Sequence, residues 1–227
     1  PNLLLPTVAI LGTVALCATY RVMFDERERR HTRRMMERYL SPAVLESVLA
    51  DPAKLALGGE RKEMTVLFSD IREFTALSER LDPQSLVGLL TEYLGAMSEA
   101  LMRHDGVLDK YIGDQVMGFW GAPVSQDQHA ALACETALDM LSALATLNRA
   151  WSARGLPQLT VGIGVNTGFV SVGNFGSPSR FDYTVIGDPV NTCSRLQALN
   201  KDYGTSILIT ERTRRAIGDA FVTRFVD

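Results

Sequence analysis

The chain has 227 residues, of which 46% are hydrophobic and 22% are charged, so it carries enough apolar side chains to bury a globular core. Its formal net charge is -3 and the part that looks folded has no basic stripe, which argues against nucleic-acid binding. The three cysteines are widely separated and odd in number, which excludes a disulfide framework and favours a reducing compartment.

The first predicted element is a helix that crosses a membrane. Leu3 to Tyr20 contains eighteen residues without a charge, and a helix of that length spans about 27 Å. The alternatives are a buried globular helix and a secretory signal. A secretory signal would begin with basic residues and end at a cleavage site, and neither feature is visible here. Arg21 begins an arginine-rich flank, which by the positive-inside rule places the rest of the chain in the cytoplasm. We therefore expect a transmembrane helix over residues 1–24.

A helical linker is expected next. Residues 25–39 contain no Gly or Pro and are rich in Arg and Glu, which predicts a charged helix. Ser41 and Pro42 are a typical cap and first position of a second helix. Gly58 and Gly59 then interrupt the helical pattern. This predicts a cytoplasmic linker over residues 25–61 and a folded domain over residues 62–227.

The folded domain alternates between strand-like and helix-like periodicity. Strands are expected at 64–71, 107–112, 116–121, 159–165, 169–174 and 206–210, and helices at 83–104, 126–153 and 189–200. Gly113-Asp114 and Asn166-Thr167-Gly168 lie between pairs of apolar runs and predict hairpin turns. This order predicts an α+β fold with helices packed on one face of an antiparallel-rich sheet.

Two aspartates are candidate metal ligands. Asp70 ends the first strand in FSDIREFT, and Asp114 lies at the tip of the hairpin in DKYIGDQVM. Carboxylates at a strand end and a hairpin tip can converge at one sheet edge, where their hard oxygens favour Mg²⁺ or Mn²⁺ and hence phosphates. The alternative is that Asp70 caps a helix starting near Phe74 and that Asp114 is only a turn residue.

Two further segments suggest anion binding. Ile71 to Thr75 leads from strand to helix and could offer backbone N–H groups to phosphates, although it lacks P-loop spacing. Asp188-Pro189 predicts a helix start that places Asn191 and Arg195 on one face, near an end that favours anions. A capping Asn and a surface Arg are the alternative. The glycines of VGIGVNTG are expected to allow close packing or a turn.

The segments FSDIREFT, DKYIGD and YTVIGDPVNTCSR together resemble the class III adenylate and guanylate cyclases, in family order, over roughly Tyr39 to Asp227. The resemblance implies a ferredoxin-like domain that pairs head to tail as a homodimer and binds ATP at the interface. The 3′-hydroxyl of ATP would attack the α-phosphorus, giving cyclic AMP and pyrophosphate. GNFGSPSRFDY would be an arm that reaches across the dimer.

The resemblance also implies roles for individual residues. Asp70 and Asp114, with the Ile71 carbonyl, would hold two Mg²⁺ or Mn²⁺ ions. Lys110 and Thr184 would recognise adenine. The remaining substrate contacts would come from Asn191 at the ribose, Arg195 at the phosphates in the transition state, and Phe74 and Thr75.

The segment before the domain resembles bacterial membrane cyclases, which implies an inner-membrane location and an upstream sensor, often of the CHASE2 kind. Three departures from the family pattern are visible. Thr184 stands where many members have Asp, and Glu73 stands where Gly is common. The sequence also ends at Asp227, before the strand pair that carries a phosphate-contacting lysine in the family, so we expect a C-terminally truncated domain.

Two rival functions remain. A guanylate cyclase would carry a Glu and Cys-like pair in place of Lys110 and Thr184. A catalytically silent receptor domain would only bind nucleotide or dimerise. Such a domain would not need all of the residues that the cyclase reaction uses, which are Asp70, Asp114, Asn191 and Arg195.

Overall fold

The computed structural model describes Tyr20, residues 49–50 and residues 57–226. The chain divides into a unit Pro1–Leu45 and a unit Glu46–Asp227. The predicted transmembrane helix and almost all of the predicted linker lie outside the described residues. The fold and the site described below belong to the second unit.

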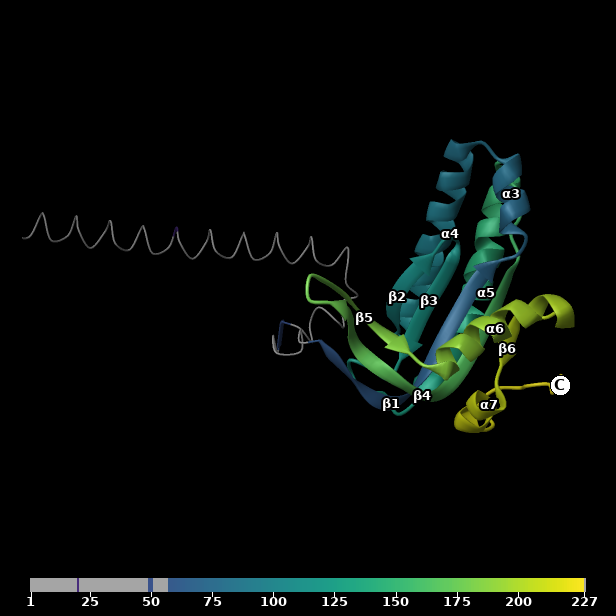
Figure 1. Ribbon diagram of the computed structural model, residues 1–227. Coiled ribbons are helices and arrows are strands. Elements are labelled where there is room, and N and C mark those ends of the chain that lie inside the picture. Colours follow the sequence, from purple (N-terminus) through teal and green to yellow (C-terminus); the bar gives the residue numbers. More distant parts are fainter. Residues whose placement is uncertain (1–19, 21–48, 51–56, 227) are drawn as a thin grey trace, which may run out of the picture. The chain divides into compact units, whose positions relative to one another are not determined.

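The described domain is built on one mixed sheet (Figure 1). Its six strands are β1 (Gly58–Ile71), β2 (Val107–Ile112), β3 (Gln115–Trp120), β4 (Val161–Ser177), β5 (Arg180–Ile186) and β6 (Ile207–Ile209). The order is β2-β3-β1-β4-β5 with antiparallel pairing, and β6 pairs with β4 in parallel. The expected α+β class and antiparallel-rich sheet are confirmed.

The helices are α3 (Phe74–Arg80), α4 (Pro83–Arg103), α5 (His129–Ala153), α6 (Asp188–Tyr203) and α7 (Glu211–Ile217). Helix α4 begins where predicted, because the Asp82 carboxylate accepts from the backbone N–H groups of Gln84 and Ser85 at 3.1 and 3.0 Å. Helices α4 and α5 cover one face of the sheet, where Tyr93, Trp120 and other large side chains are fully buried. Each such side chain contributes roughly 1.5–3 kcal/mol by its burial.

Helix α5 is long and apolar enough to span a membrane, and it is the helix that meets this test among the described residues. Its apolar side nevertheless faces the core, with Ala137 and Met140 fully buried against α4 and the sheet. Burial against this core explains the apolar composition of α5, so α5 is a core helix.

The expectation that helices cover only one face is wrong, because α6 packs on the other. Added Cβ atoms at Gly162 and Gly164 would lie 3.1 and 2.6 Å from Gln197 atoms of α6, whereas the intervening Ile163 belongs to the core shared with α5. The Cys193 thiol donates to the Gly164 carbonyl at 3.2 Å. The glycines therefore allow close packing between α6 and β4, as the sequence predicted.

The expected turn at residues 166–168 is also wrong, since β4 runs without interruption from Val161 to Ser177. The polar side chains find partners inside the fold instead. The Asn166 amide donates to the Pro189 carbonyl at 2.7 Å, and Thr167 Oγ1 lies 2.8 Å from Thr65 Oγ1. Because their hydrogen-bonding groups have partners, these polar residues can occupy a buried strand.

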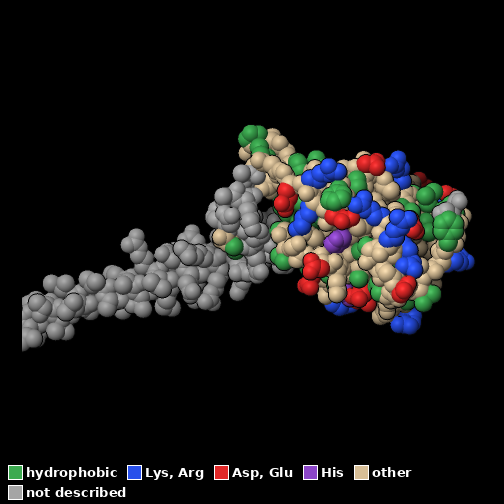
Figure 2. All heavy atoms as spheres, turned by 90° about the horizontal axis from the view of Figure 1, so that it is seen from below, with side chains coloured by type: hydrophobic (Ala, Val, Ile, Leu, Met, Phe, Trp, Pro, Cys, Tyr) green, Lys and Arg blue, Asp and Glu red, His purple; other side chains and the backbone are tan. Residues whose placement is uncertain are grey.

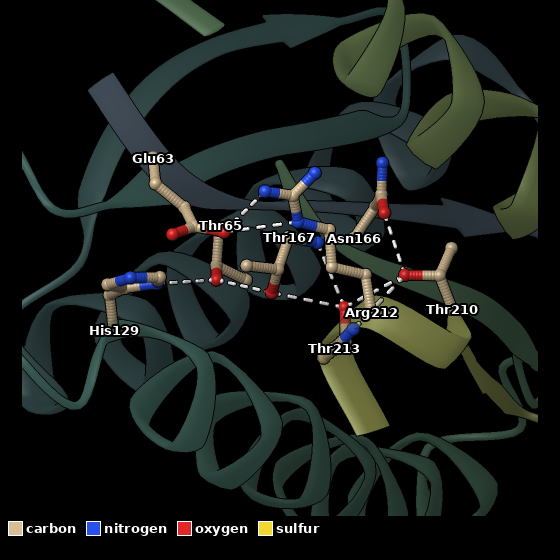
Figure 3. A network of polar contacts seen from close by, with 8 residues as sticks. All are labelled: Glu63, Thr65, His129, Asn166, Thr167, Thr210, Arg212 and Thr213. Carbon is tan, nitrogen blue, oxygen red and sulfur yellow. Dashed lines mark hydrogen bonds and ion pairs between the residues drawn. The ribbon is translucent and has the colours of Figure 1, made fainter. Parts of the chain in front are cut away.

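Thr167 belongs to a polar network that joins β1, β4, α5 and the segment around α7 (Figure 3). The hydroxyls of Thr65 and Thr213 extend it to the His129 ring at one side and to Thr210 at the other. Burial lowers the pKa of His129, which keeps the ring neutral in this network. The network holds α7 against β4 through Thr213; the sequence pattern does not predict this helix.

Two boundaries differ from those expected. Strand β1 begins at Gly58, which pairs with Asn174, so the expected domain boundary at residue 61 lies inside a strand. Gly59 fits there because an added Cβ would lie 2.6 Å from the Phe175 ring. Helix α6 has Gly187 as its N-cap, with φ 144°, and Asp188 is its first residue rather than its cap.

Candidate active site

The two predicted metal ligands meet at one edge of the sheet. Asp70 is the penultimate residue of β1, and Asp114 lies in the turn between β2 and β3, where Gly113 has φ +68°. Antiparallel pairing of β1 with β3 brings that turn beside the end of β1. Asp114 Oδ2 accepts the Ile71 N–H at 3.1 Å. Helix α3 has Glu73 as its N-cap without a side-chain cap bond, so Asp70 is not the cap.

The electrostatics of this pair fit a divalent cation. Burial, the hydrogen bond with Asp114 and the Asp114 charge together raise the pKa of Asp70 to about 7. Within the described residues, no ion pair joins either carboxylate to Lys or Arg, and no third His, Cys, Asp or Glu completes a metal-binding cluster. A cation here would therefore bind two hard carboxylates and take further oxygen ligands from backbone and substrate.

The segment from Ile71 to Thr75 offers fewer free N–H groups than predicted. The Ile71 N–H donates to Asp114, and the Arg72 N–H donates to the Thr160 carbonyl at 2.8 Å. Phe74 packs its ring against the core. The Thr75 side chain is exposed and the Phe74 side chain is half-buried.

A second group gathers the two predicted base-recognition residues. Thr184 Oγ1 on β5 donates to Asp109 Oδ2 on β2 at 2.5 Å, although these strands lie at opposite ends of the sheet order. The rings of Phe119 and Tyr183 lie 6.3 Å apart, which shows that β5 folds back over the sheet. Lys110 Nζ lies 3.6 Å from Asp109 Oδ1 and 3.9 Å from Asp182 Oδ2. Lys110 and Thr184 therefore flank one buried carboxylate.

A third group lies in the first turns of α6. Asn191 is exposed, and Arg195 Nη2 lies 3.5 Å from Asp188 Oδ1 and 3.4 Å from Thr192 Oγ1. The Arg195 side chain is 71% exposed. An exposed ion pair of this kind contributes little to stability, so the guanidinium can turn toward an anionic ligand at a small cost.

The predicted residues thus form three groups within one chain: Asp70, Ile71 and Asp114; Lys110 and Thr184; Asn191 and Arg195. Among the described residues, no hydrogen bond or ion pair links one group to another.

Residues 59–224 match the family model for the adenylate and guanylate cyclase catalytic domain. The chain belongs to this cyclase family. The match starts inside β1, in agreement with the strand's beginning at Gly58. The catalytic-domain resemblance of the three sequence segments is therefore confirmed.

Three similar proteins are nucleotide cyclases. Adenylate cyclase 1 of Rhizobium meliloti (strain 1021) is 43% identical over 148 residues, which cover 65% of this chain and 22% of the relative. The adenylyl cyclase CyaB from P. aeruginosa has 40% identity and a TM-score of 0.67, covering 72% of this chain and 84% of the solved one. The guanylyl cyclase Cya2 has 39% identity and the same TM-score, with 72% and 82% covered.

These similarities establish the family but not whether the substrate carries adenine or guanine. The cyclase domain is almost equally similar to an adenylyl and a guanylyl cyclase, so the choice of base is argued from Lys110 and Thr184, the residues that the sequence predicts to recognise it. The chain spans about a fifth of the length of the Rhizobium relative. Asp109, which no sequence motif singles out, lies buried between Lys110 and Thr184. Its only signal in the sequence is a carboxylate inside an otherwise strand-like run, VLDKYI.

Glu73, which stands where the family commonly has Gly, has a left-handed backbone with φ 57° and ψ 29°. A non-Gly residue costs roughly 1 kcal/mol in this region. We expect Glu73→Gly to raise the free energy of unfolding by about 1 kcal/mol. If nucleotide phosphates bind at Asp70 and Asp114 as the sequence predicts, the loss of the Glu73 charge should also lower the KM for ATP. Chemical denaturation and steady-state kinetics measure the two effects.

The matched control is Asp105, which also has a left-handed backbone, with φ 54°. It precedes β2, at the end away from the Asp114 turn. Asp105→Gly should relieve strain without changing the KM for ATP. An equal change of KM in both variants would show that Glu73 does not face the phosphates.

Proposed function

We propose that this cyclase domain converts ATP to 3′,5′-cyclic AMP and pyrophosphate in a site shared by two copies of the chain. The observation that carries the choice of ATP is the group around Asp109, where Lys110 and Thr184 lie within reach of one carboxylate. A Lys ammonium is a pure donor that suits N1 of adenine, and a hydroxyl can accept from the N6 amino group. Guanine has an O6 acceptor and an N1–H donor at the corresponding positions, which is the opposite pattern of donors and acceptors.

At the phosphate end, the chain's own residues hold and orient the reacting groups. Asp70, Asp114 and the Ile71 carbonyl would hold two Mg²⁺ or Mn²⁺ ions, which when bound neutralise the triphosphate and favour the 3′-alkoxide. Asn191 orients the ribose, so that its 3′-oxygen faces the α-phosphorus. Arg195 binds the phosphate oxygens as the bond to the 3′-oxygen forms and the bond to pyrophosphate breaks.

The shared site follows from the separation of the three groups. The Asp70–Asp114 pair has no described contact with Arg195 or with Lys110, so a head-to-tail partner can supply what one copy lacks. Large apolar side chains are exposed on β2 and β5, where a partner can cover them: Tyr111, Ile112, Phe181 and Ile186. The hairpin of β4 and β5 projects beyond β2 and β3 (Figure 1), as expected for an arm that crosses a dimer.

The test is to incubate the full chain with ATP or GTP and Mn²⁺ and to measure the cyclic product. We expect cyclic AMP to form at least tenfold faster than cyclic GMP. A preference for GTP would favour the guanylate cyclase alternative. Nucleotide binding without either product would favour a silent receptor domain.

Nucleic acid is not among the proposed partners. Figure 2 shows Lys and Arg side chains interspersed with Asp and Glu on the face it presents, without a stripe of one sign. The net charge of -3 agrees with this mixed surface.

We also propose that Leu3 to Tyr20 anchors the protein in the inner membrane, with the cyclase domain in the cytoplasm and a sensor upstream. The proposal rests on the uncharged run and its basic flank. The protein should stay in the membrane fraction after alkaline carbonate washing, and its C-terminal part should resist protease added to sealed cells. Release by carbonate would contradict a spanning helix.

A further inference from the structure

Asp109 is a buried carboxylate with an unusual pair of neighbours. Its side chain is 1% exposed, and Oδ2 accepts from Thr184 Oγ1 at 2.5 Å. Its other oxygen, Oδ1, has no hydrogen-bond partner and lies 3.6 Å from Lys110 Nζ. A buried carboxylate oxygen left without a hydrogen bond is costly, so a structural role alone explains this arrangement poorly.

The charge of Asp109 is set by the groups that face it. Burial raises the pKa of Asp109 above its ordinary value, and the Asp182 charge adds weakly to this rise, whereas the Thr184 hydrogen bond and the Lys110 charge oppose it. The 2.5 Å distance from Thr184 is typical of a hydroxyl that donates to an ionised carboxylate. An ionised carboxylate can only accept hydrogen bonds.

This fixes what Thr184 can offer a ligand. A hydroxyl has a single hydrogen and two lone pairs, and the Thr184 hydrogen is used by Asp109. Toward the nucleotide, Thr184 is therefore an acceptor. Lys110, held beside the same carboxylate, has only hydrogens to donate.

We propose that Asp109 is a positioning residue that makes the pocket selective for adenine, by holding Thr184 as an acceptor and Lys110 as a donor. Adenine matches this pair with its N6–H group and its N1 lone pair. Guanine presents O6 and N1–H, so it meets two mispaired groups. The inference rests on the proposed function, since it assigns the base-recognition group to the nucleotide.

The experiment measures binding of 3′-deoxy-ATP and 3′-deoxy-GTP to the full chain with Mn²⁺ by calorimetry. Both lack the attacking hydroxyl and bind without reacting. Asp109→Asn keeps the shape but can donate to Thr184, which frees the Thr184 hydrogen for O6 of guanine. We expect the ratio of the Kd for the GTP analogue to that for the ATP analogue to fall at least tenfold in this variant.

Asp182→Asn is the matched control, because Asp182 also lies near Lys110, at 3.9 Å, but its side chain is 67% exposed. It should change the ratio less than about twofold. A folded Asp109→Asn variant that weakens both analogues equally, or leaves the ratio unchanged, overturns the inference.

A measurement on the unaltered chain covers the case in which Asp109→Asn does not fold. Hypoxanthine carries O6 and N1–H without the 2-amino group of guanine, so 3′-deoxy-ITP should bind at least tenfold more weakly than 3′-deoxy-ATP. Equal binding would overturn the inference. A chain that keeps the adenine preference but forms no cyclic product contradicts only the proposed function, whereas a chain that binds no nucleotide contradicts both.

Discussion

Asp70→Ala and Asp114→Ala are each expected to lower cyclase activity roughly a hundredfold or more at saturating Mn²⁺, while the domain stays folded. Both carboxylates converge at one sheet edge without a basic partner among the described residues. Removing one halves the charge available to the cations. Asp70→Ala also removes a carboxylate whose ionisation burial and Asp114 oppose, so its stability in EDTA should not fall, whereas Asp114→Ala also loses the acceptor of the Ile71 N–H and should lose about 1 kcal/mol. Activity within tenfold of the unaltered chain, in either variant, would contradict the metal-ligand role.

A second readout separates metal binding from chemistry. A ligand that binds only the folded state raises the melting temperature, so Mn²⁺ should stabilise the unaltered chain in the absence of nucleotide. The two variants should lose this stabilisation. Asp219→Ala is the matched control, because that carboxylate is fully exposed after α7, beside Arg214. It should keep both the activity and the Mn²⁺ effect.

The convergence of Asp70 and Asp114 could be predicted from the sequence because their geometry is local. A strand that ends at Asp70 and a two-residue turn that contains Asp114 need only one strand pairing to meet. Turn chemistry and strand periodicity are both short-range signals. The same reasoning placed Asn191 and Arg195 on one face of α6 correctly, since residues four apart share a helix face.

Long-range polar partners explain where prediction failed. Asn166, Thr167 and Gly168 look like a turn in the sequence, but Pro189, Thr65 and Thr213 supply their contacts across the fold. Nothing within a few residues of 166–168 indicates these partners.

Asp109 shows the same limit at the site itself. Its partner Thr184 is 75 residues away and lies on a strand at the opposite end of the sheet order. Sequence alone selected Lys110 and Thr184 through the family resemblance. The Asp109 carboxylate between them can be recognised only in the structure, where the curvature of the sheet brings β5 over β2.

Mixing two inactive variants is expected to restore activity if each site is built from two chains. Asp70→Ala removes the metal half of a site, and Arg195→Ala removes the group that binds the phosphates in the transition state, so each variant alone should be nearly inactive. In a two-fold symmetric heterodimer, one site collects both lesions and the other collects neither. With equal amounts and random pairing, half of the dimers are mixed and one of their two sites works. Activity should then recover to about a quarter of the unaltered level.

The structure gives this result its physical basis. Lys110 lies beside Asp109 and Asp182, whereas Asp114 accepts the Ile71 N–H, so the two side chains belong to separate groups within one chain. Arg195 is exposed, and within the part of the chain that the structure describes its guanidinium contacts only Asp188 and Thr192, so it can turn toward a partner's site. Subunit exchange is verified by pull-down of differently tagged chains. If exchange occurs and the mixture stays as inactive as its components, each site is built within one chain, and the exposed apolar side chains of β2 and β5 require another partner.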